Sequence, residues 1–136
     1  MRDVTVSRFV RAAPAALERA LTPTALVTYE EAFAVRDVTE SPRETRVVAD
    51  ARGFAVALVF EEEADGLRYR QDGDGGPYER METTVRWRRE NEGVRVTVQS
   101  SIAVGLFPRP LTNRVAAWKR EAELDTLLDR LAETVE

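Results

Sequence analysis

The sequence contains no cysteine and no histidine. The lack of cysteine excludes disulfide bonds, a thiolate nucleophile and a zinc–thiolate cluster. The lack of histidine removes the commonest general base and the commonest ligand of transition metals. We therefore expect no metal site and no cofactor, and composition alone excludes much of enzyme chemistry.

Long apolar runs are also missing. The longest, Phe54–Phe60, is far shorter than the ~20 residues that span a bilayer. The opening residues MRDVTVSRFV contain no apolar signal core, which a secreted protein would need. We therefore expect a cytoplasmic protein without stable membrane insertion, and the sequence leaves its oligomeric state open.

We expect the basic residues of this sequence not to form a nucleic-acid site. The formal net charge is -4, which opposes non-specific binding to nucleic acid. Arg86, Arg88 and Arg89 surround Trp87, an arrangement that could bind single strands by charge and stacking. Strand alternation directs Arg86 and Arg88 away from Trp87, so we interpret the strip as a solvated outer face and expect no nucleic-acid partner.

The 136 residues, of which 43% are hydrophobic, suit one domain with a sizeable core, and we assign residues 1–136 to it. Val4, Val6 and Val10 recur at even positions, which predicts a first strand. Residues 13–21 are rich in helix formers and carry Pro14 near their start, so a short helix follows. Residues 23–27 predict a second helical turn.

The middle of the chain alternates short apolar-periodic runs with turn signals, which predicts six successive antiparallel strands. Their ranges are 29–39, 45–51, 54–64, 67–71, 78–89 and 94–104. After Pro108 and Pro110, apolar residues at three- and four-residue spacing predict a long amphipathic helix from about Leu111. These are Leu111, Val115, Trp118, Ala122, Leu124, Leu127, Leu128, Leu131 and Val135.

Side-chain parity predicts the register of three hairpins, because a one-residue slip would turn an apolar face outward. In the last hairpin, Thr83 faces Ser100, between apolar pairs on either side. A turn at Arg52-Gly53 sets Ala51, Ala49 and Val47 opposite Phe54, Val56 and Leu58. A turn at Asp65-Gly66 sets Glu62 opposite Tyr69, Phe60 opposite Gln71, Glu63 opposite Arg68 and Glu61 opposite Arg70.

The stretch QDGDGGPY, residues 71–78, has the composition of a metal or phosphate loop. A calcium loop starting at Asp72 would have Gly76, Pro77 and Thr83 where an oxygen ligand, a glycine and a glutamate are needed. A phosphate loop needs GxxxxGK[ST] followed by a helix, and a strand follows here. We therefore predict a hairpin connection.

The order of strand, short helices, six-stranded meander and long C-terminal helix resembles the START-like helix-grip superfamily (SRPBCC), which includes polyketide cyclases and lipid-transfer domains. The opening VTVSRFVRAAPAALERALTP resembles the usual start of its members. The resemblance covers essentially the whole chain and implies an α+β fold. The implied fold consists of a seven-stranded antiparallel curved sheet, two short helices after the first strand and a long C-terminal helix. No catalytic signature is common to the group, so no catalytic residue is carried over.

Members of this group typically hold an apolar ligand between the sheet and the C-terminal helix, which implies a ligand site on the inner face. An ordinary packed core would use the same residues, and Thr83 with Ser100 could be a simple cross-strand hydrogen bond. Gln71 and Val35 are also expected to face inward. The candidate ligand-binding residues are Phe33, Leu58, Phe60, Tyr69, Met81, Thr83, Val85, Trp87, Val98, Ser100, Ile102, Val115 and Trp118.

The resulting functional hypothesis is binding or transport of a small hydrophobic molecule, such as a lipid, an isoprenoid or a polyketide-like compound. An alternative is an enzyme of polyketide cyclase or dehydratase type that uses inward polar residues: Glu62 as a base, Tyr69 as an acid or an oxyanion donor, or another inward polar group. A second alternative is a protein-interaction module of the chaperone-regulator kind, which would have a filled core.

Overall fold

The computed structural model describes residues 2–31, 33–51, 54–73, 78–104 and 109–136. Its elements lie in the order that the sequence predicts. They are β1 (Arg2–Val10), α1 (Pro14–Ala20), α2 (Pro23–Tyr29), β2 (Ala34–Glu40), β3 (Thr45–Ala51), β4 (Phe54–Glu63), β5 (Gly66–Asp72), β6 (Arg80–Glu90), β7 (Gly93–Ala103) and α3 (Arg109–Val135).

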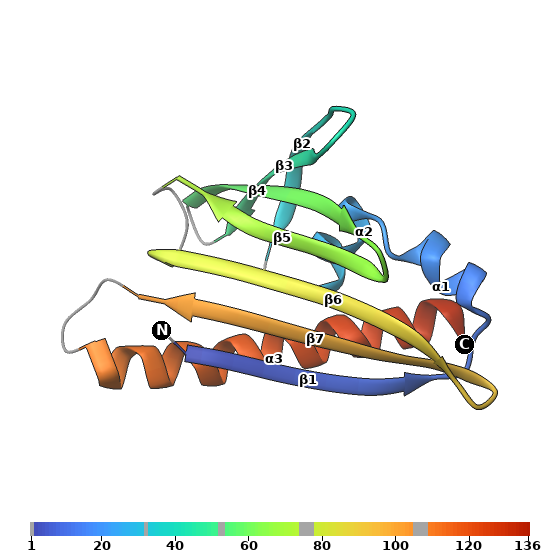
Figure 1. The fold of residues 1–136 in the computed structure, drawn as a ribbon. Coiled ribbons are helices and arrows are strands. Elements are labelled where there is room, and N and C mark those ends of the chain that lie inside the picture. Colours follow the sequence, from blue (N-terminus) through green and yellow to red (C-terminus); the bar gives the residue numbers. More distant parts are fainter. Residues whose placement is uncertain (1, 32, 52–53, 74–77, 105–108) are drawn as a thin grey trace.

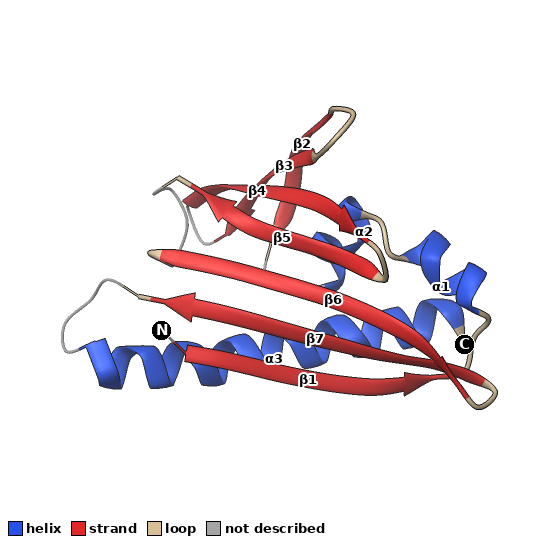
Figure 2. Ribbon diagram, in the orientation of Figure 1, coloured by secondary structure: helices blue, strands red, loops and turns tan. Residues whose placement is uncertain are grey.

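The strands form one seven-stranded antiparallel sheet in the order β1-β7-β6-β5-β4-β3-β2. The sheet curves, and α3 runs along it beside β1 and β7 (Figure 1). Both short helices lie between β1 and β2 in the chain, and α1 lies beside the C-terminal end of α3 (Figure 2). This arrangement confirms the predicted helix-grip architecture.

Two of the three predicted registers are confirmed. Thr83 of β6 faces Ser100 of β7, and Ala49 of β3 faces Val56 of β4. The residues of the predicted Arg52-Gly53 turn lie outside the described part of the chain, as do Asp74 to Pro77 of QDGDGGPY. In the β3–β4 and β6–β7 hairpins, the residues that parity predicted to be opposite one another are paired.

The predicted β4–β5 register is wrong by two residues. Gly66 begins β5 and pairs with Glu63, whereas we placed it in the turn for its conformational freedom. The structure requires glycine here for another reason: a Cβ atom at Gly66 would lie 1.9 Å from the carbonyl oxygen of Val85. The shift preserves the faces but changes the pairs, so that Phe60 lies opposite Tyr69 and Glu61 opposite Arg68.

The helices also differ from prediction at their ends. The strand expected from residue 29 begins at Ala34, because α2 continues to Tyr29. Helix α3 begins at Arg109, slightly before the predicted start at Leu111. Pro110 is tolerated in this first turn because the N–H it lacks would have no intrahelical acceptor there.

The C-terminal half of α3 anchors the helix to the sheet. Its leucine stripe is buried in the main core, together with β1 residues such as Val6 and Val10. Arg8 of β1 adds an ion pair with Asp129 of α3 at the surface. Burial of the apolar stripe supplies most of the attachment, because exposed ion pairs contribute little. The stripe consists of Leu124, Leu127, Leu128 and Leu131.

A buried polar cluster as the candidate functional site

Arg120 of α3 is completely buried, with 0% of its side chain exposed. Its Nε donates to Ser100 Oγ at 3.2 Å. Its Nη2 donates to the Tyr69 hydroxyl and to Thr83 Oγ1, both at 3.0 Å. These acceptors form one row across β5, β6 and β7, because Tyr69 pairs with Thr83 and Thr83 with Ser100. The guanidinium is therefore held over the middle of the inner face.

Two carboxylates complete the arrangement around Arg120. Glu30, which follows α2, is 3% exposed. Its Oε1 lies 3.2 Å from Arg120 Nη2 and accepts a hydrogen bond from the Tyr69 hydroxyl. Glu123 Oε1 lies 3.3 Å from Arg120 Nη1 and accepts a hydrogen bond from the Tyr78 hydroxyl at 3.3 Å. We call this set the polar cluster: Glu30, Tyr69, Tyr78, Thr83, Ser100, Arg120 and Glu123.

The backbone at the end of α2 directs Glu30 inward. Glu31 has a φ of 60°, in the left-handed region that residues other than glycine seldom occupy. This conformation ends the helical path, and the two neighbouring carboxylates diverge. Glu30 binds Arg120 in the interior, whereas Glu31 lies 2.6 Å from Arg130 Nε at the surface. The short segment after α2 is thus attached to α3 at two points.

Burial and charge set the ionisation of the cluster. Burial alone would lower the pKa of Arg120, but Glu30 and the other acidic neighbours raise it more, so the guanidinium stays cationic. Burial, followed by the charge of Glu30, raises the pKa of Tyr69 well above its ordinary value of 10.0. Burial raises the pKa of Tyr78 in the same direction. Both phenols therefore keep their protons at neutral pH and can act as donors.

Two buried oxygens near the cluster have no hydrogen-bond partner among the described residues: Glu30 Oε2 and Gln71 Oε1. Gln71 is linked to the cluster because its Nε2 donates to the Tyr78 carbonyl at 2.6 Å. Buried acceptors are usually paired, so these atoms require an explanation. They mark the inner face as more than a close-packed apolar core.

A groove of about 540 Å³ approaches the inner face from the side of the short helices. Phe60 and Leu67, both members of the core, form its inner end. Phe60 stacks on Tyr69 with ring centroids 4.6 Å apart, which places the groove one aromatic ring away from the polar cluster. We call it the helix–hairpin groove, and its lining residues are Glu18, Leu21, Thr22, Pro23, Glu40, Ser41, Pro42, Arg43, Glu44, Thr45, Phe60, Glu61, Glu62 and Leu67.

Solved structures share this architecture over nearly the whole chain. A protein from Thermus thermophilus is 23% identical, with a TM-score of 0.65, and the match covers 99% of this chain and 100% of that one. A START superfamily protein from Mycobacterium smegmatis is 13% identical, with a TM-score of 0.69 and coverage of 96% and 97%. The chain has the START-like helix-grip fold. No family model and no curated protein sequence matches it.

A third structure with the helix-grip fold is the di-domain ARO/CYC BexL from the BE-7585A biosynthetic pathway. It is 14% identical, with a TM-score of 0.71, and the match covers 99% of this chain and 50% of that one. At such identities the likeness concerns the fold alone. Among the described residues of the present chain, no helix combines the length and apolar character needed to cross a membrane.

Most of the predicted ligand-binding residues are buried, and none of the buried ones is more than 9% exposed. Trp87 is only partly buried, and packs against the edge of the core. The buried residues of this set lie in the interior, and the role of the set in ligand binding stays a prediction. The buried residues are Phe33, Leu58, Phe60, Tyr69, Met81, Thr83, Val85, Val98, Ser100 and Ile102.

The predicted inward direction of Val115 and Trp118 is wrong, since they are 58% and 76% exposed. The apolar face that we drew through both residues is out of phase with the leucine stripe. Extending the stripe back by four residues from Leu124 leads to Arg120, and this spacing was the available signal. The residue type points the other way, because a charged residue is rarely fully buried unless it is paired.

The predicted pair of Glu62 and Tyr69 does not form. Glu62 is exposed and lies opposite Leu67, as a consequence of the two-residue change in register. The carboxylate beside Tyr69 belongs instead to Glu30, which we had placed in a strand. Gln71 likewise lies opposite Leu58 and not Phe60.

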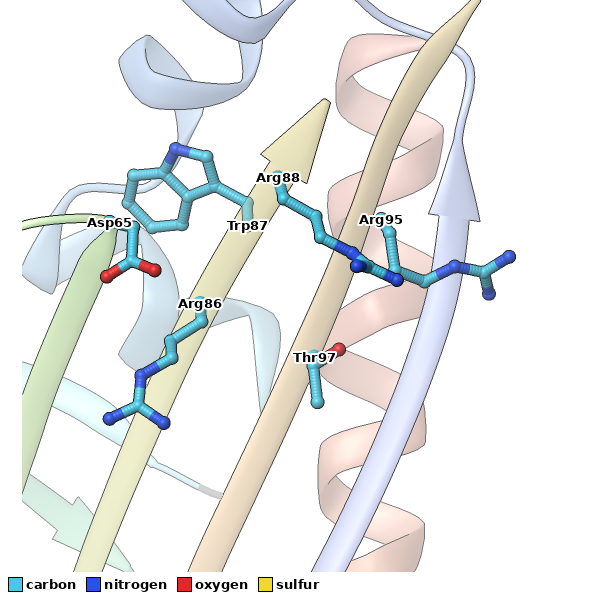
Figure 3. Close-up of a pocket in the computed structure, with 6 residues that line it drawn as sticks. All are labelled: Asp65, Arg86, Trp87, Arg88, Arg95 and Thr97. Carbon is cyan, nitrogen blue, oxygen red and sulfur yellow. The ribbon is translucent and has the colours of Figure 1, made fainter. Parts of the chain in front are cut away.

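Arg86 and Arg88 line a separate hollow of about 210 Å³ together with Trp87. Figure 3 shows the indole of Trp87 beside Asp65, with Arg86 and Arg88 extending in other directions. Glu63 lies 3.6 Å from Arg86, so a carboxylate partly balances this positive charge. The hollow also includes Arg95 and Thr97.

Proposed function

We propose that this helix-grip domain binds or carries a small hydrophobic molecule, such as a lipid, an isoprenoid or a polyketide-like compound, in the cytoplasm. The observation that carries the proposal is the polar cluster at the centre of an apolar inner face. Ligand sites for small molecules combine an apolar lining with a few placed polar groups. The inner face offers this combination around Arg120.

The energetics of Arg120 favour a functional role for the cluster. Removing a guanidinium and a carboxylate from water costs several kcal/mol for each ion (~3 or more), and apolar residues of similar volume often give equal or greater stability. Stability alone therefore does not explain why Arg120 stands where the helix stripe otherwise has leucines. Recognition of a ligand's polar group by the cluster, in which Arg120 holds Glu30 and Tyr69 in place, would explain it.

The helix–hairpin groove supports a route to this site. Its inner end at Phe60 and Leu67 is apolar, and its volume of about 540 Å³ lies in the usual range for small-molecule sites. Phe60 itself is only 2% exposed, so a ligand must move this side chain or its neighbours to reach Tyr69. Binding is accordingly expected to be accompanied by local opening.

Native mass spectrometry of the purified protein, followed by organic extraction, tests the proposal. A stoichiometric apolar compound, or uptake of one from a lipid mixture, is the expected result. Leu67→Trp should reduce uptake by filling the inner end of the groove. Ala64→Trp places the same indole on the exposed β4–β5 turn and should leave uptake unchanged. Absence of any bound or acquired apolar compound would contradict the proposal.

A second candidate is an enzyme of cyclase or dehydratase type. The hydrogen bond between the Tyr69 phenol and the Glu30 carboxylate, beside a buried guanidinium, favours it. Tyr69 would stabilise a developing negative charge as a hydrogen-bond donor, because its raised pKa keeps the phenol protonated and disfavours transfer of the proton. Tyr69→Phe should then abolish conversion of the extracted compound while retaining its binding. Unchanged conversion, or none in the wild type, would favour a carrier.

A further inference from the structure

The polar cluster leaves two acceptors unsatisfied in one part of the inner face. Glu30 Oε2 and Gln71 Oε1 are both buried, and neither has a hydrogen-bond partner among the described residues. Both lie near Tyr69. Glu30 accepts the hydrogen bond of its phenol, and Gln71 lies two residues further along β5 on the same face, about 7 Å away at the rise of a strand. A ligand that meets Tyr69 can therefore meet either oxygen.

The orientation of the Gln71 amide follows from its other contacts. Its nitrogen donates to the carbonyl oxygens of Tyr78, at 2.6 Å, and Gly73, at 3.4 Å. The reversed amide would place its oxygen against both carbonyl oxygens, where no hydrogen bond is possible. The unpaired atom is therefore an acceptor, as it is in Glu30. What the site requires is a donor.

The charge of the cluster points the same way. Arg120 faces two carboxylates, Glu30 at 3.2 Å and Glu123 at 3.3 Å. Its guanidinium also donates to the hydroxyls of Ser100, Tyr69 and Thr83. An additional anion would meet an excess of negative charge around an arginine that is already neutralised. Like charges close together in a buried site repel strongly, which disfavours a carboxylate ligand.

We propose that the polar end of the ligand is a hydroxyl group that donates a hydrogen bond to Glu30 Oε2, with its apolar body directed towards Phe60. A ligand with a second hydroxyl donates it to Gln71 Oε1. This inference rests on the proposed function and narrows it: alcohols and phenols with an apolar body bind, whereas fatty acids of the same length are rejected.

Three probes of matched length separate the donor from the charge. 1-Decanol carries a donor, methyl nonyl ether is uncharged without one, and decanoate is an anion. We expect isothermal titration of the full chain to give decanol an affinity about tenfold higher than that of the ether, because the ether leaves the buried acceptor unpaired. Decanoate should bind more weakly still. An ether that binds as tightly as decanol, or a decanoate that binds more tightly, would overturn the inference and leave the proposed function intact.

Glu30→Gln tests the role of Glu30 Oε2, because the glutamine amide retains the shape of the side chain but changes its donors and acceptors. The preference for decanol over the ether should shrink to within about twofold. Glu31→Gln removes the same charge at the neighbouring residue, which faces Arg130 at the surface, and leaves Glu30 Oε2 in place, so the preference should remain. Retention of the preference in Glu30→Gln, or its loss in both variants, would refute the role of Glu30. If Glu30→Gln does not fold, the wild-type ranking of the probes decides alone.

Failure of the proposed function has a different signature. In that case none of the three probes binds the wild type, and native mass spectrometry finds no apolar compound.

Discussion

The two halves of α3 present the same helical stripe to the interior but fill it with different chemistry. In the C-terminal half the stripe consists of leucines, including Leu124, Leu127 and Leu131, all 0% exposed. One turn before them the same stripe carries Arg120, while the apolar Val115 and Trp118 face outward. The comparison shows that position on the helix, and not the hydrophobicity of each residue, decides what is buried. It also separates an anchoring half from a half that presents a polar group.

The largest effect is expected at the polar half. Arg120→Ala removes the cation that faces Glu30 and Glu123 and leaves their buried charge uncompensated. We expect the free energy of unfolding to fall by about 3–5 kcal/mol, as for other buried pairs that lose one partner. Urea unfolding of the wild type and the variant at neutral pH measures this difference in the free energy of unfolding.

The matched test of this explanation uses Arg120→Met alone and combined with Glu30→Gln. The double variant should be more stable than Arg120→Met, because the unpaired carboxylate is gone. A double variant with simply additive losses would show that the pair does not act as a unit.

The anchoring half should respond as an apolar core. Leu127→Ala is expected to lower the free energy of unfolding by about 2–5 kcal/mol through lost burial and the cavity it leaves. Ligand uptake by the folded variant should persist, since Leu127 is not in the polar cluster. A variant with near-normal stability and no uptake would reverse the division between the two halves.

Alkaline pH should affect the polar cluster around Arg120 selectively. The pKa of Tyr69 is raised above 10.0 in the folded protein, so the unfolded chain loses this proton first. The stabilisation is fully present below pH 10.0 and is lost as the pH rises from there towards the folded pKa. Tyrosinate absorbance and circular dichroism during an alkaline titration should therefore change together. Ionisation of all tyrosines with an intact fold would contradict the raised pKa.

The smallest effect is expected on the outer face of the same half. Trp118→Ser should change the free energy of unfolding by less than about 0.5 kcal/mol, because the side chain is largely exposed. It should also remove the more accessible part of the tryptophan fluorescence in acrylamide quenching, since Trp87 is partly buried. A strong loss of stability would mean that Trp118 packs against the protein.

Local patterns predicted most of the architecture, because strand alternation and turn residues depend on near neighbours in sequence. The Thr83–Ser100 pair was predictable for this reason, since one hairpin brings both residues together. Gly66 could not be placed from its type, because glycine suits a turn and a close contact between strands equally well. The helix ends were correct to within a few residues.

The polar cluster was not predictable in the same way. It unites Glu30 with Arg120, and no local pattern connects residues so far apart. The inward direction of Glu30 depends on one unusual backbone conformation at Glu31. The residue type of Glu31 does not predict this conformation, because positive φ is uncommon for residues other than glycine. Only the spacing of the α3 leucines indicates that Arg120 faces the interior, whereas its charge predicts an exposed side chain.

The double attachment of the α2 end to α3 has a consequence for how the chain folds. Glu30 and Glu31 meet their partners, Arg120 and Arg130, only after α3 has been made. The first strand likewise pairs with the last one. Contacts so distant in sequence slow the search for the native state. We therefore expect a nascent chain on the ribosome to stay incompletely folded until α3 emerges, with the polar cluster forming among the last contacts.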